Sequence, residues 1–377
     1  MRSETPSPGS TPNRADPAVA PVGGNLTLGL MSSVRTEILS GKWPLHARLP
    51  TDRALARAHG VGLNTVRRAL GALVDEGLLE RRRGSGTFVI GTPTPVQEAA
   101  PVVGILVPTT RRYFPDLIAG LESVVRSAGG HLLLRSTERD QSRELNLLDD
   151  LVAQHPTGLV VVPTLFGVVD PDVYLRRIGA LDVPTVLAER VPTGSAGRSL
   201  SYVATDTAEG GRLAVEHLYG LGRRRIGLLS SRNTATSEQL LDGFRVAVAE
   251  YAMNSERAVA RRPEWDEDDL ASYARRARSL GLDAVVCLGD RNAAQLLPQL
   301  RRVGLTVPDD VAVVAYENEV ARDAEIPLTT VEPPRLEVGR LAGELLLRQV
   351  ELGSGATPVR VEIAPRLVVR SSTVPPA

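Results

Sequence analysis

Side chains that can hydrogen-bond to bases and phosphates are concentrated between residues 53 and 86. Asn64, Arg67 and Arg68 stand at the start of a segment with helical apolar spacing, and asparagine and arginine recognise adenine and guanine edges through paired hydrogen bonds. The arginine run 81–83 precedes the turn Gly84-Ser85-Gly86, where it could grip a phosphate backbone. The pattern indicates a surface that binds double-stranded DNA. The candidate contacts are Arg53, Asn64, Thr65, Arg67, Arg68, Arg82, Arg83, Gly84, Ser85 and Gly86.

Three helices and a hairpin are needed to hold these side chains in place, and the sequence predicts them. The apolar spacing of residues 30–38 predicts a first helix, with Gly41 just beyond its end. Thr51 is a typical N-cap for a second helix, and Gly60-Val61-Gly62 forms the turn to a third. The apolar stripe 66–74 of that third helix leaves its first turn facing solvent or a DNA groove.

The charge of the chain is unevenly distributed, although its formal net charge is zero. Residues 31–90 contain ten basic and five acidic side chains, an excess of +5 that suits a polyanionic partner. Taken singly, Arg53 and Arg57 could be solvated helix charges, Asn64 could assist a helix cap, and 81–83 could be an ordinary surface run. The combined pattern is more specific than any of its members.

The remainder of the composition describes a cytoplasmic protein of two or three domains. The single cysteine, Cys287, lies in an apolar run and fits a reducing compartment. No apolar run is long enough to span a bilayer, and the Pro-, Gly-, Ser- and Thr-rich residues 1–25 read as a disordered tail without a signal peptide. Residues 26–90 form the basic block, 91–100 a Pro-bearing linker, and 101–377 the remaining domain.

Short β-branched runs alternate with amphipathic segments throughout residues 101–377. This alternation predicts parallel sheets covered by helices on both faces, and the length favours two α/β lobes. The expected strands are 102–107, 131–135, 158–162, 184–188, 225–230, 283–288 and 311–315.

Ligands of open α/β sheets bind beyond the carboxyl ends of the strands, so the polar residues at those ends are candidate ligand contacts. Carboxylates and an aromatic face there suit a polyhydroxylated ligand. Asp206 and Asp290 could equally be helix N-caps, and Glu189 with Arg190 could be a surface ion pair. The candidate ligand-binding residues are Tyr113, Phe114, Ser136, Arg190, Asp206, Asp290 and Glu317.

Catalytic and metal-binding constellations are missing from the sequence. The five histidines show no close metal-ligand spacing, and there is no G-x-S-x-G elbow, P-loop or dinucleotide fingerprint. We therefore expect no enzymatic activity, no cofactor and no metal. Three classes are compared: a ligand-responsive DNA-binding regulator, a cytoplasmic binding protein whose basic head is only a tether, and a sugar-processing enzyme. The first is favoured.

Residues 28–90 resemble the winged helix-turn-helix domain of the GntR regulators. The resemblance implies DNA contacts from Arg53, from Arg67 and from the wing at 84–86. Where most members have Ser or Thr followed by Arg, this chain has Gly62 and Leu63, so a base-reading arginine is missing. The matching segments are Ile38–Gly41, Leu49–Ala56, Thr65–Leu70 and Glu80–Val89.

Residues 101–373 resemble the effector domain of LacI-type regulators, a two-lobed fold like that of periplasmic binding proteins. Together with the GntR-like head, this arrangement resembles the arabinose-repressor subgroup and implies a homodimeric repressor controlled by a small effector, for which a sugar-like molecule is a candidate. Asp206 and Asp290 match effector-contacting positions, whereas the family's arginine falls on Leu240 and its asparagine on Gly289. The ligand is then smaller or less polar than a typical sugar, or other side chains substitute. The matching segments are Val103–Pro108, His217–Ile226, Asp242–Arg245, Val307–Val311, Leu328–Val331 and Arg366–Thr373.

Overall fold

The computed structural model describes residues 23–91, 100–165, 170–192, 194–230, 235–259, 265–353 and 356–374. The chain divides into two compact units, Met1–Ala99 and Ala100–Ala377. Most of the expected tail and linker lies outside the described residues. Residues 23–25, which composition assigns to the tail, already belong to the first helix. Within the described ranges, no helix is both long and apolar enough to cross a membrane.

The first unit consists of three helices and an antiparallel hairpin. Its small core contains Val34, Val66, Leu70, Leu73 and Val89, all fully buried, so the three helices and the hairpin share one apolar centre. The hairpin register pairs residue 79 with residue 89 and residue 82 with residue 86. The elements are α1 (Gly23–Leu39), α2 (Asp52–Ala58), α3 (Leu63–Asp75), β1 (Leu79–Arg82) and β2 (Gly86–Val89).

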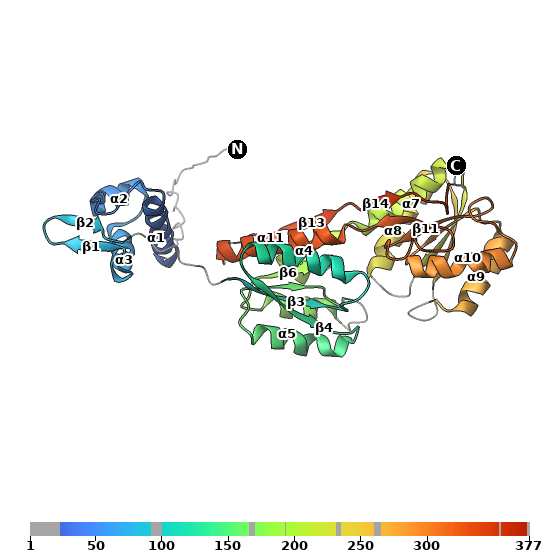
Figure 1. Ribbon diagram of the computed structural model, residues 1–377, viewed down its shortest axis with the longest axis horizontal. Helices are drawn as coiled ribbons and strands as arrows, with labels where there is room; N and C mark the ends of the chain where they lie inside the picture. Colours follow the sequence, from blue (N-terminus) through green and yellow to red (C-terminus); the bar gives the residue numbers. More distant parts are fainter. Residues whose placement is uncertain are drawn as a thin grey trace, which may run out of the picture. The chain divides into compact units, whose positions relative to one another are not determined.

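The second unit contains two lobes, each with a six-stranded sheet covered by helices on both faces (Figure 1). In lobe 1 the strand order is β13-β7-β6-β5-β3-β4, and every pairing is parallel. The strands are β3 (Val102–Val107), β4 (His131–Ser136), β5 (Gly158–Val161), β6 (Thr185–Ala188), β7 (Ser201–Thr205) and β13 (Arg360–Ile363). The helices are α4 (Phe114–Ser127), α5 (Glu144–Val152), α6 (Pro171–Gly179) and α11 (Arg335–Leu352), with short 3-10 turns η1 (Gln141–Arg143) and η2 (Ala196–Ser199).

Lobe 2 has the strand order β14-β12-β11-β10-β8-β9, in which only the β12–β14 pairing is antiparallel. Helices α7 and α8 cover one face of this sheet, and α9 and α10 cover the other. The strands are β8 (Arg225–Ser230), β9 (Asn254–Val259), β10 (Ala284–Cys287), β11 (Ala312–Tyr316), β12 (Thr329–Glu332) and β14 (Arg366–Val368). The helices are α7 (Thr207–Gly220), α8 (Ala235–Glu250), α9 (Glu267–Leu280) and α10 (Asp290–Arg302).

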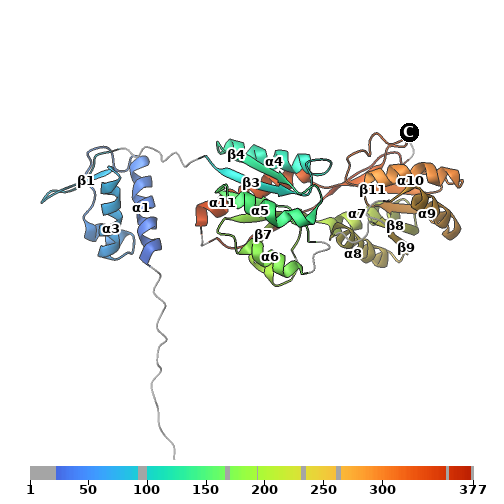
Figure 2. The same ribbon diagram turned by 90° about the horizontal axis from the view of Figure 1, so that it is seen from below.

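The chain passes between the lobes three times: after β7, after β12 and after β13. Lobe 1 is therefore completed by α11 and β13, which come from the end of the sequence. Helix α11 lies along α4, and two glycines allow their backbones to approach closely (Figures 1 and 2). A Cβ built on Gly120 would lie 2.0 Å from the carbonyl oxygen of Leu336, and one on Gly339 would lie 2.0 Å from that of Leu117.

The expectation of two α/β lobes is confirmed. All seven expected strands are present, with ends that shift by one residue at most. The structure adds five strands in this unit that the sequence did not predict: β7, β9, β12, β13 and β14.

Candidate functional site

The first turn of α3 presents polar side chains on a helix that is anchored from behind. Leu63, Asn64, Arg67 and Arg68 are exposed, and Thr65 is half-buried, whereas the apolar stripe that includes Leu70 is packed into the core. This is the orientation that the periodicity predicts. The Thr51 side chain accepts a hydrogen bond from the Ala54 amide and so caps α2, which carries the exposed Arg53. The helix start can therefore enter a groove without disturbing the core.

The hairpin forms a wing whose tip is exposed at Arg83, Gly84 and Ser85. Gly84 and Gly86 have φ angles of +77° and +118°, a region that glycine adopts readily. The guanidinium of Arg82 lies 4.9 Å from the centre of the Phe88 ring and also pairs with Glu80 at 2.8 Å. The wing therefore holds its cations on an ordered surface.

Arg48, beside the wing, and Arg81, at the start of the predicted run 81–83, were not among the predicted individual DNA contacts. Arg48 is exposed, and its Nε atom would lie 2.7 Å from a Cβ added to Gly86. Arg81 and Arg67 both approach the carboxylate of Asp52, at 3.9 and 3.8 Å. Asp52 thereby links the wing to α3. Arg48 gave no sequence signal because only the folded strand pairing brings it to residue 88.

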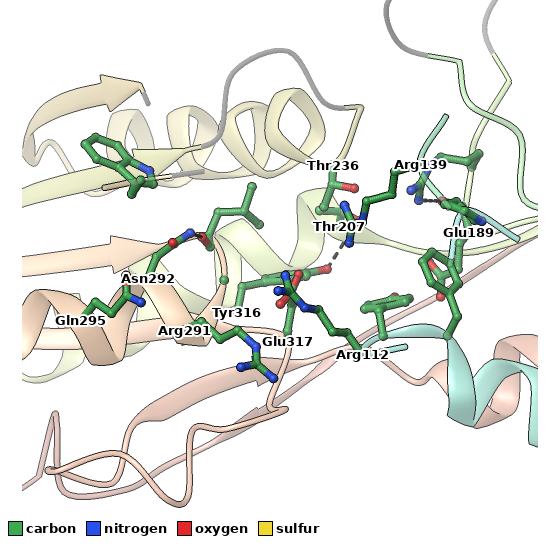
Figure 3. A pocket seen from close by; sticks show the side chains of 17 residues that line it. Arg112, Arg139, Glu189, Thr207, Thr236, Arg291, Asn292, Gln295, Tyr316 and Glu317 are labelled. Atoms are coloured by element: carbon green, nitrogen blue, oxygen red, sulfur yellow. Dashed lines mark hydrogen bonds between the residues drawn. The ribbon is translucent and has the colours of Figure 1, made fainter. Parts of the chain in front are cut away.

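In the second unit, a cavity of about 420 Å³ lies between the carboxyl ends of the strands of both lobes (Figure 3). Tyr113 and Phe114 follow β3, their rings meeting edge to face at 5.3 Å. Cavities of this size hold small organic molecules. The lining is Pro108, Arg112, Tyr113, Phe114, Arg139, Glu189, Arg190, Thr207, Thr236, Trp265, Leu288, Gly289, Arg291, Asn292, Gln295, Tyr316 and Glu317.

The cavity lining brings together four of the seven ligand candidates: Tyr113, Phe114, Arg190 and Glu317. Ser136, Asp206 and Asp290 lie outside it. The Ser136 hydroxyl donates to Glu138 at 2.7 Å, and Asp206 caps α7 by accepting from the Glu209 amide at 2.9 Å. The N-cap interpretation thus describes the contact that Asp206 makes.

Asp290 is fully buried behind the wall of the cavity. One of its carboxylate oxygens accepts hydrogen bonds from the amides of Val320 and Ala321, at 2.6 and 3.0 Å. The other oxygen has no hydrogen-bond partner among the described residues. Asp290 therefore holds a backbone turn beside the cavity, and α10 begins at this residue with Gly289 as its N-cap.

Two glutamates, one from each lobe, line the cavity with backbone angles that are rare for non-glycine residues. Glu189 has φ +55° and Glu317 φ +105°. Burial raises the pKa of Glu189, whose carboxylate accepts a 3.1 Å hydrogen bond from Thr205. Burial, with the nearby charges of Glu319 and Asp290, raises the pKa of Glu317 to about 7. Both carboxyls are placed to exchange hydrogen bonds with hydroxyl groups of a ligand.

Three acidic side chains meet next to this wall. Oxygen atoms of Asp290, Glu317 and Glu319 all lie within 4.8 Å of one another. The Nε atom of Arg291 is 3.7 Å from a carboxylate oxygen of Glu319, and the charge of Arg335 offsets part of the increase in the pKa values of Glu317 and Glu319. Arginines therefore supply the countercharge for this group.

The two positions that depart from the family pattern have different surroundings. Leu240 is fully buried in the core between α8 and the sheet of lobe 2 and does not line the cavity. Gly289 lines the cavity with φ +88°. Leucine at position 240 removes no polar contact from the cavity, because this side chain packs in the core of lobe 2.

Three of the four arginines and two of the four aromatic residues in the cavity lining were not among the residues predicted from the sequence. Arg112, Arg139 and Arg291 follow strands β3, β4 and β10 within a few residues, so the strand-end rule could have included them. Trp265 precedes α9 and reaches the cavity only through the tertiary fold.

Comparisons with known proteins agree with the folds of both the first and the second unit. Residues 26–89 match the bacterial regulatory proteins of the gntR family, and residues 215–373 match the periplasmic binding protein-like domain. The arabinose metabolism transcriptional repressor of Geobacillus stearothermophilus is 31% identical over 359 residues, covering 92% of this chain and 97% of that protein. The repressor PurR of Vibrio campbellii is 29% identical over 275 residues, covering 72% and 80%. The crystal structure of the regulator GntR from Chromobacterium violaceum, with a TM-score of 0.60 and 25% identity, covers 72% of this chain and 99% of that one.

A winged helix-turn-helix head joined to a two-lobed domain with a central cavity defines a ligand-responsive transcription regulator. The chain belongs to the GntR-family repressors that carry a periplasmic-binding-protein-like effector domain, the group to which the arabinose metabolism repressor also belongs. It is a DNA-binding repressor that responds to a small molecule.

Proposed function

We propose that the start of α3 and the wing bind the operator and that an effector in the cavity controls this binding. The observation that carries the proposal is the exposure of Asn64, Arg67 and Arg68 on one turn of a helix whose opposite face is buried. Asn64, Arg67 and Arg68 read base edges in the major groove, where asparagine and arginine can distinguish base pairs. Arg53, Thr65, Arg82, Arg83, Gly84, Ser85 and Gly86 contact the backbone or the neighbouring groove.

The effector is a small polyhydroxylated molecule, and this class is supported by the relative named as an arabinose metabolism repressor. Glu189 and Glu317 accept hydrogen bonds from its hydroxyl groups, and Tyr113 and Phe114 cover its apolar face. The chemistry is binding without turnover. Because lining residues come from both lobes, the ligand favours the closed arrangement to the extent that it binds that arrangement more tightly.

The protein acts as a homodimer in the cytoplasm, with two heads on the half-sites of a pseudo-palindromic operator. A two-fold symmetric protein matches a two-fold symmetric site, so each head binds one half-site and the dimer makes the contacts of both heads. Ligand-induced closure of the lobes changes the spacing of the heads and therefore the affinity for the operator.

Selection of bound sequences from a random duplex library identifies the operator, and fluorescence anisotropy then measures its affinity. We expect Arg67→Ala to weaken operator binding by about fivefold or more, since a base-reading arginine contributes about 1–3 kcal/mol. Arg126→Ala, which removes an exposed arginine of α4, is the charge-matched control. If the full-length protein selects no sequence, or Arg67→Ala binds as tightly as the parent, the assignment of this surface is wrong.

A further inference from the structure

The lining of the effector cavity contains more cations than anions. Arg112, Arg139 and Arg190 reach it from the loops after β3, β4 and β6 of lobe 1, and Arg291 reaches it from α10 of lobe 2. Glu189 and Glu317 are the acidic residues of the described lining. A neutral polyol needs hydrogen-bonding groups but has no need of four guanidinium groups around it.

The partners of these arginines show which of them is available to a ligand. Arg190 donates a 2.7 Å hydrogen bond to the carbonyl oxygen of Glu189, and Arg291 lies 3.7 Å from Glu319. The guanidinium of Arg139 is exposed and makes no hydrogen bond or ion pair with the residues that the structure describes. Figure 3 shows the side chains of Arg112 and Arg139 reaching into the space beside Tyr316 and Glu317.

The acidic groups around this space do not neutralise it. Asp290 and Glu319 stand behind Glu317 rather than in the lining, and the buried Arg335 faces them from the start of α11. Asp206 lies on the lobe 2 side, where it caps α7. Glu317 has its pKa raised to about 7, so near neutral pH it carries only part of a negative charge. The lining therefore keeps a positive excess.

We propose that the effector is a polyhydroxylated molecule carrying an anionic group, a phosphate or a carboxylate, which Arg139 binds. The fork of a guanidinium matches either group with two parallel hydrogen bonds. Asn292, Gln295 and Glu189 remain for the hydroxyls of the same ligand. This inference rests on the proposed effector role of the cavity and specifies the class of molecule. An anion between Arg139 of lobe 1 and Arg291 of lobe 2 would also draw the lobes together.

The test compares three probes of similar size by calorimetry on the full-length protein in a phosphate-free buffer: L-arabinose, L-arabinonate and D-arabinose 5-phosphate. We expect at least one anionic probe to bind at least tenfold more tightly than the neutral sugar. The comparison of L-arabinonate with D-arabinose 5-phosphate shows whether a carboxylate or a phosphate is preferred. Arg139→Gln should weaken the binding of that probe roughly 10- to 100-fold, since a charge-assisted hydrogen bond is lost. The affinity for the neutral sugar should stay within twofold of that of the parent. Arg139→Lys should recover part of the loss.

Arg111→Gln is the matched control, because Arg111 is an exposed arginine of the loop after β3 that does not line this cavity. Inorganic phosphate serves as a fourth probe, with Arg139-dependent binding expected in competition with the anionic sugar. The proposal is overturned if the neutral sugar binds more tightly than both anions, or if no anion, inorganic phosphate included, binds in a way that depends on Arg139. Operator binding without any ligand, measured in parallel, tests the regulator function separately.

Discussion

At the scale of single residues, Leu63 is an apolar side chain at a position where most members of the GntR family have an arginine. It is 37% exposed at the first position of α3, directly before Asn64, and contributes little to the core. An exposed leucine at the end of a recognition helix suits the methyl group of thymine, the apolar feature of the major groove. Because the family's arginine is replaced here, we expect the operator to differ from the common family sites at the base that this position faces.

We expect Leu63→Ala to relax the preference for an A·T pair at one position of each half-site by about fivefold, equivalent to about 1 kcal/mol. Binding profiles of the parent and the variant on operators mutated one base pair at a time measure this change. Leu280→Ala, which trims an exposed leucine at the end of α9, serves as the control. Identical profiles for Leu63→Ala and the parent would contradict the role.

Glu317 makes a second prediction at this scale, because the folded protein raises the pKa of its carboxyl to about 7. The folded state holds the proton more tightly than the unfolded chain, so this stabilisation is complete below the ordinary glutamate pKa and is lost as pH rises through 7. Glu317→Gln should therefore raise the free energy of unfolding on the order of 2 kcal/mol more at pH 8 than at pH 5.

Urea unfolding of the parent and of Glu317→Gln at both pH values provides the measurement. Glu351→Gln, at an exposed position near the end of α11, should leave the pH dependence unchanged. An equal effect of Glu317→Gln at pH 5 and pH 8 would show that this carboxyl keeps its usual pKa in the fold.

At the scale of elements, the close contact of α4 with α11 depends on glycines rather than on large apolar side chains. We expect Gly339→Ala to lower the free energy of unfolding by about 1–3 kcal/mol, because its Cβ would meet the carbonyl oxygen of Leu117 at 2.0 Å. Gly220→Ala at the end of α7 has open space around the added methyl and is the control. Thermal unfolding measures the stability of both variants. If Gly339→Ala were as stable as Gly220→Ala, the close approach of α4 and α11 would contribute nothing to stability.

The burial of each strand explains which strands could be predicted from the sequence. Central strands such as β3, β5 and β10 are buried on both faces, so they read as continuous apolar runs. The edge strand β9, Asn254–Val259, is largely polar because its side chains remain accessible, and β14 is only three residues long. Neither has a periodicity that could be recognised.

The site was predictable to the extent that it follows strand ends. Tyr113, Arg190 and Glu317 were found by that rule, because the carboxyl ends of parallel strands meet along one edge of the sheet. Asp206 and Asp290 satisfy the same rule, but their oxygens bind backbone amides instead. A sequence does not show whether a carboxylate at a helix start is used by the chain or is left for a ligand.

At the scale of the whole molecule, the charge needed for DNA binding is confined to one part of a chain that is neutral overall. The basic excess of +5 between residues 31 and 90 lies in the unit that contains α3 and the wing. Operator affinity should therefore fall steeply with salt, whereas neutral sugars should bind the cavity almost independently of it.

We expect Arg53→Ala and Arg83→Ala each to reduce the slope of log affinity against log salt concentration by about 1, with a similar loss on specific and random duplexes. Anisotropy titrations between low and physiological salt measure the slope. Arg276→Ala in lobe 2, at an arginine paired with Glu256, should leave it unchanged. A slope unaffected by both head variants would exclude them from phosphate contact.

Because the chain passes between the lobes three times, the parts of lobe 1 are synthesised at different times. The first five strands of lobe 1 leave the ribosome early, but α11 and β13 follow only after β12 of lobe 2 has been synthesised. Until then Leu117, Leu121 and Val125, which α11 buries, have no partner helix. The apolar face of α4 therefore stays uncovered in nascent lobe 1 until α11 has been synthesised, and exposed apolar surface of this kind is prone to aggregation.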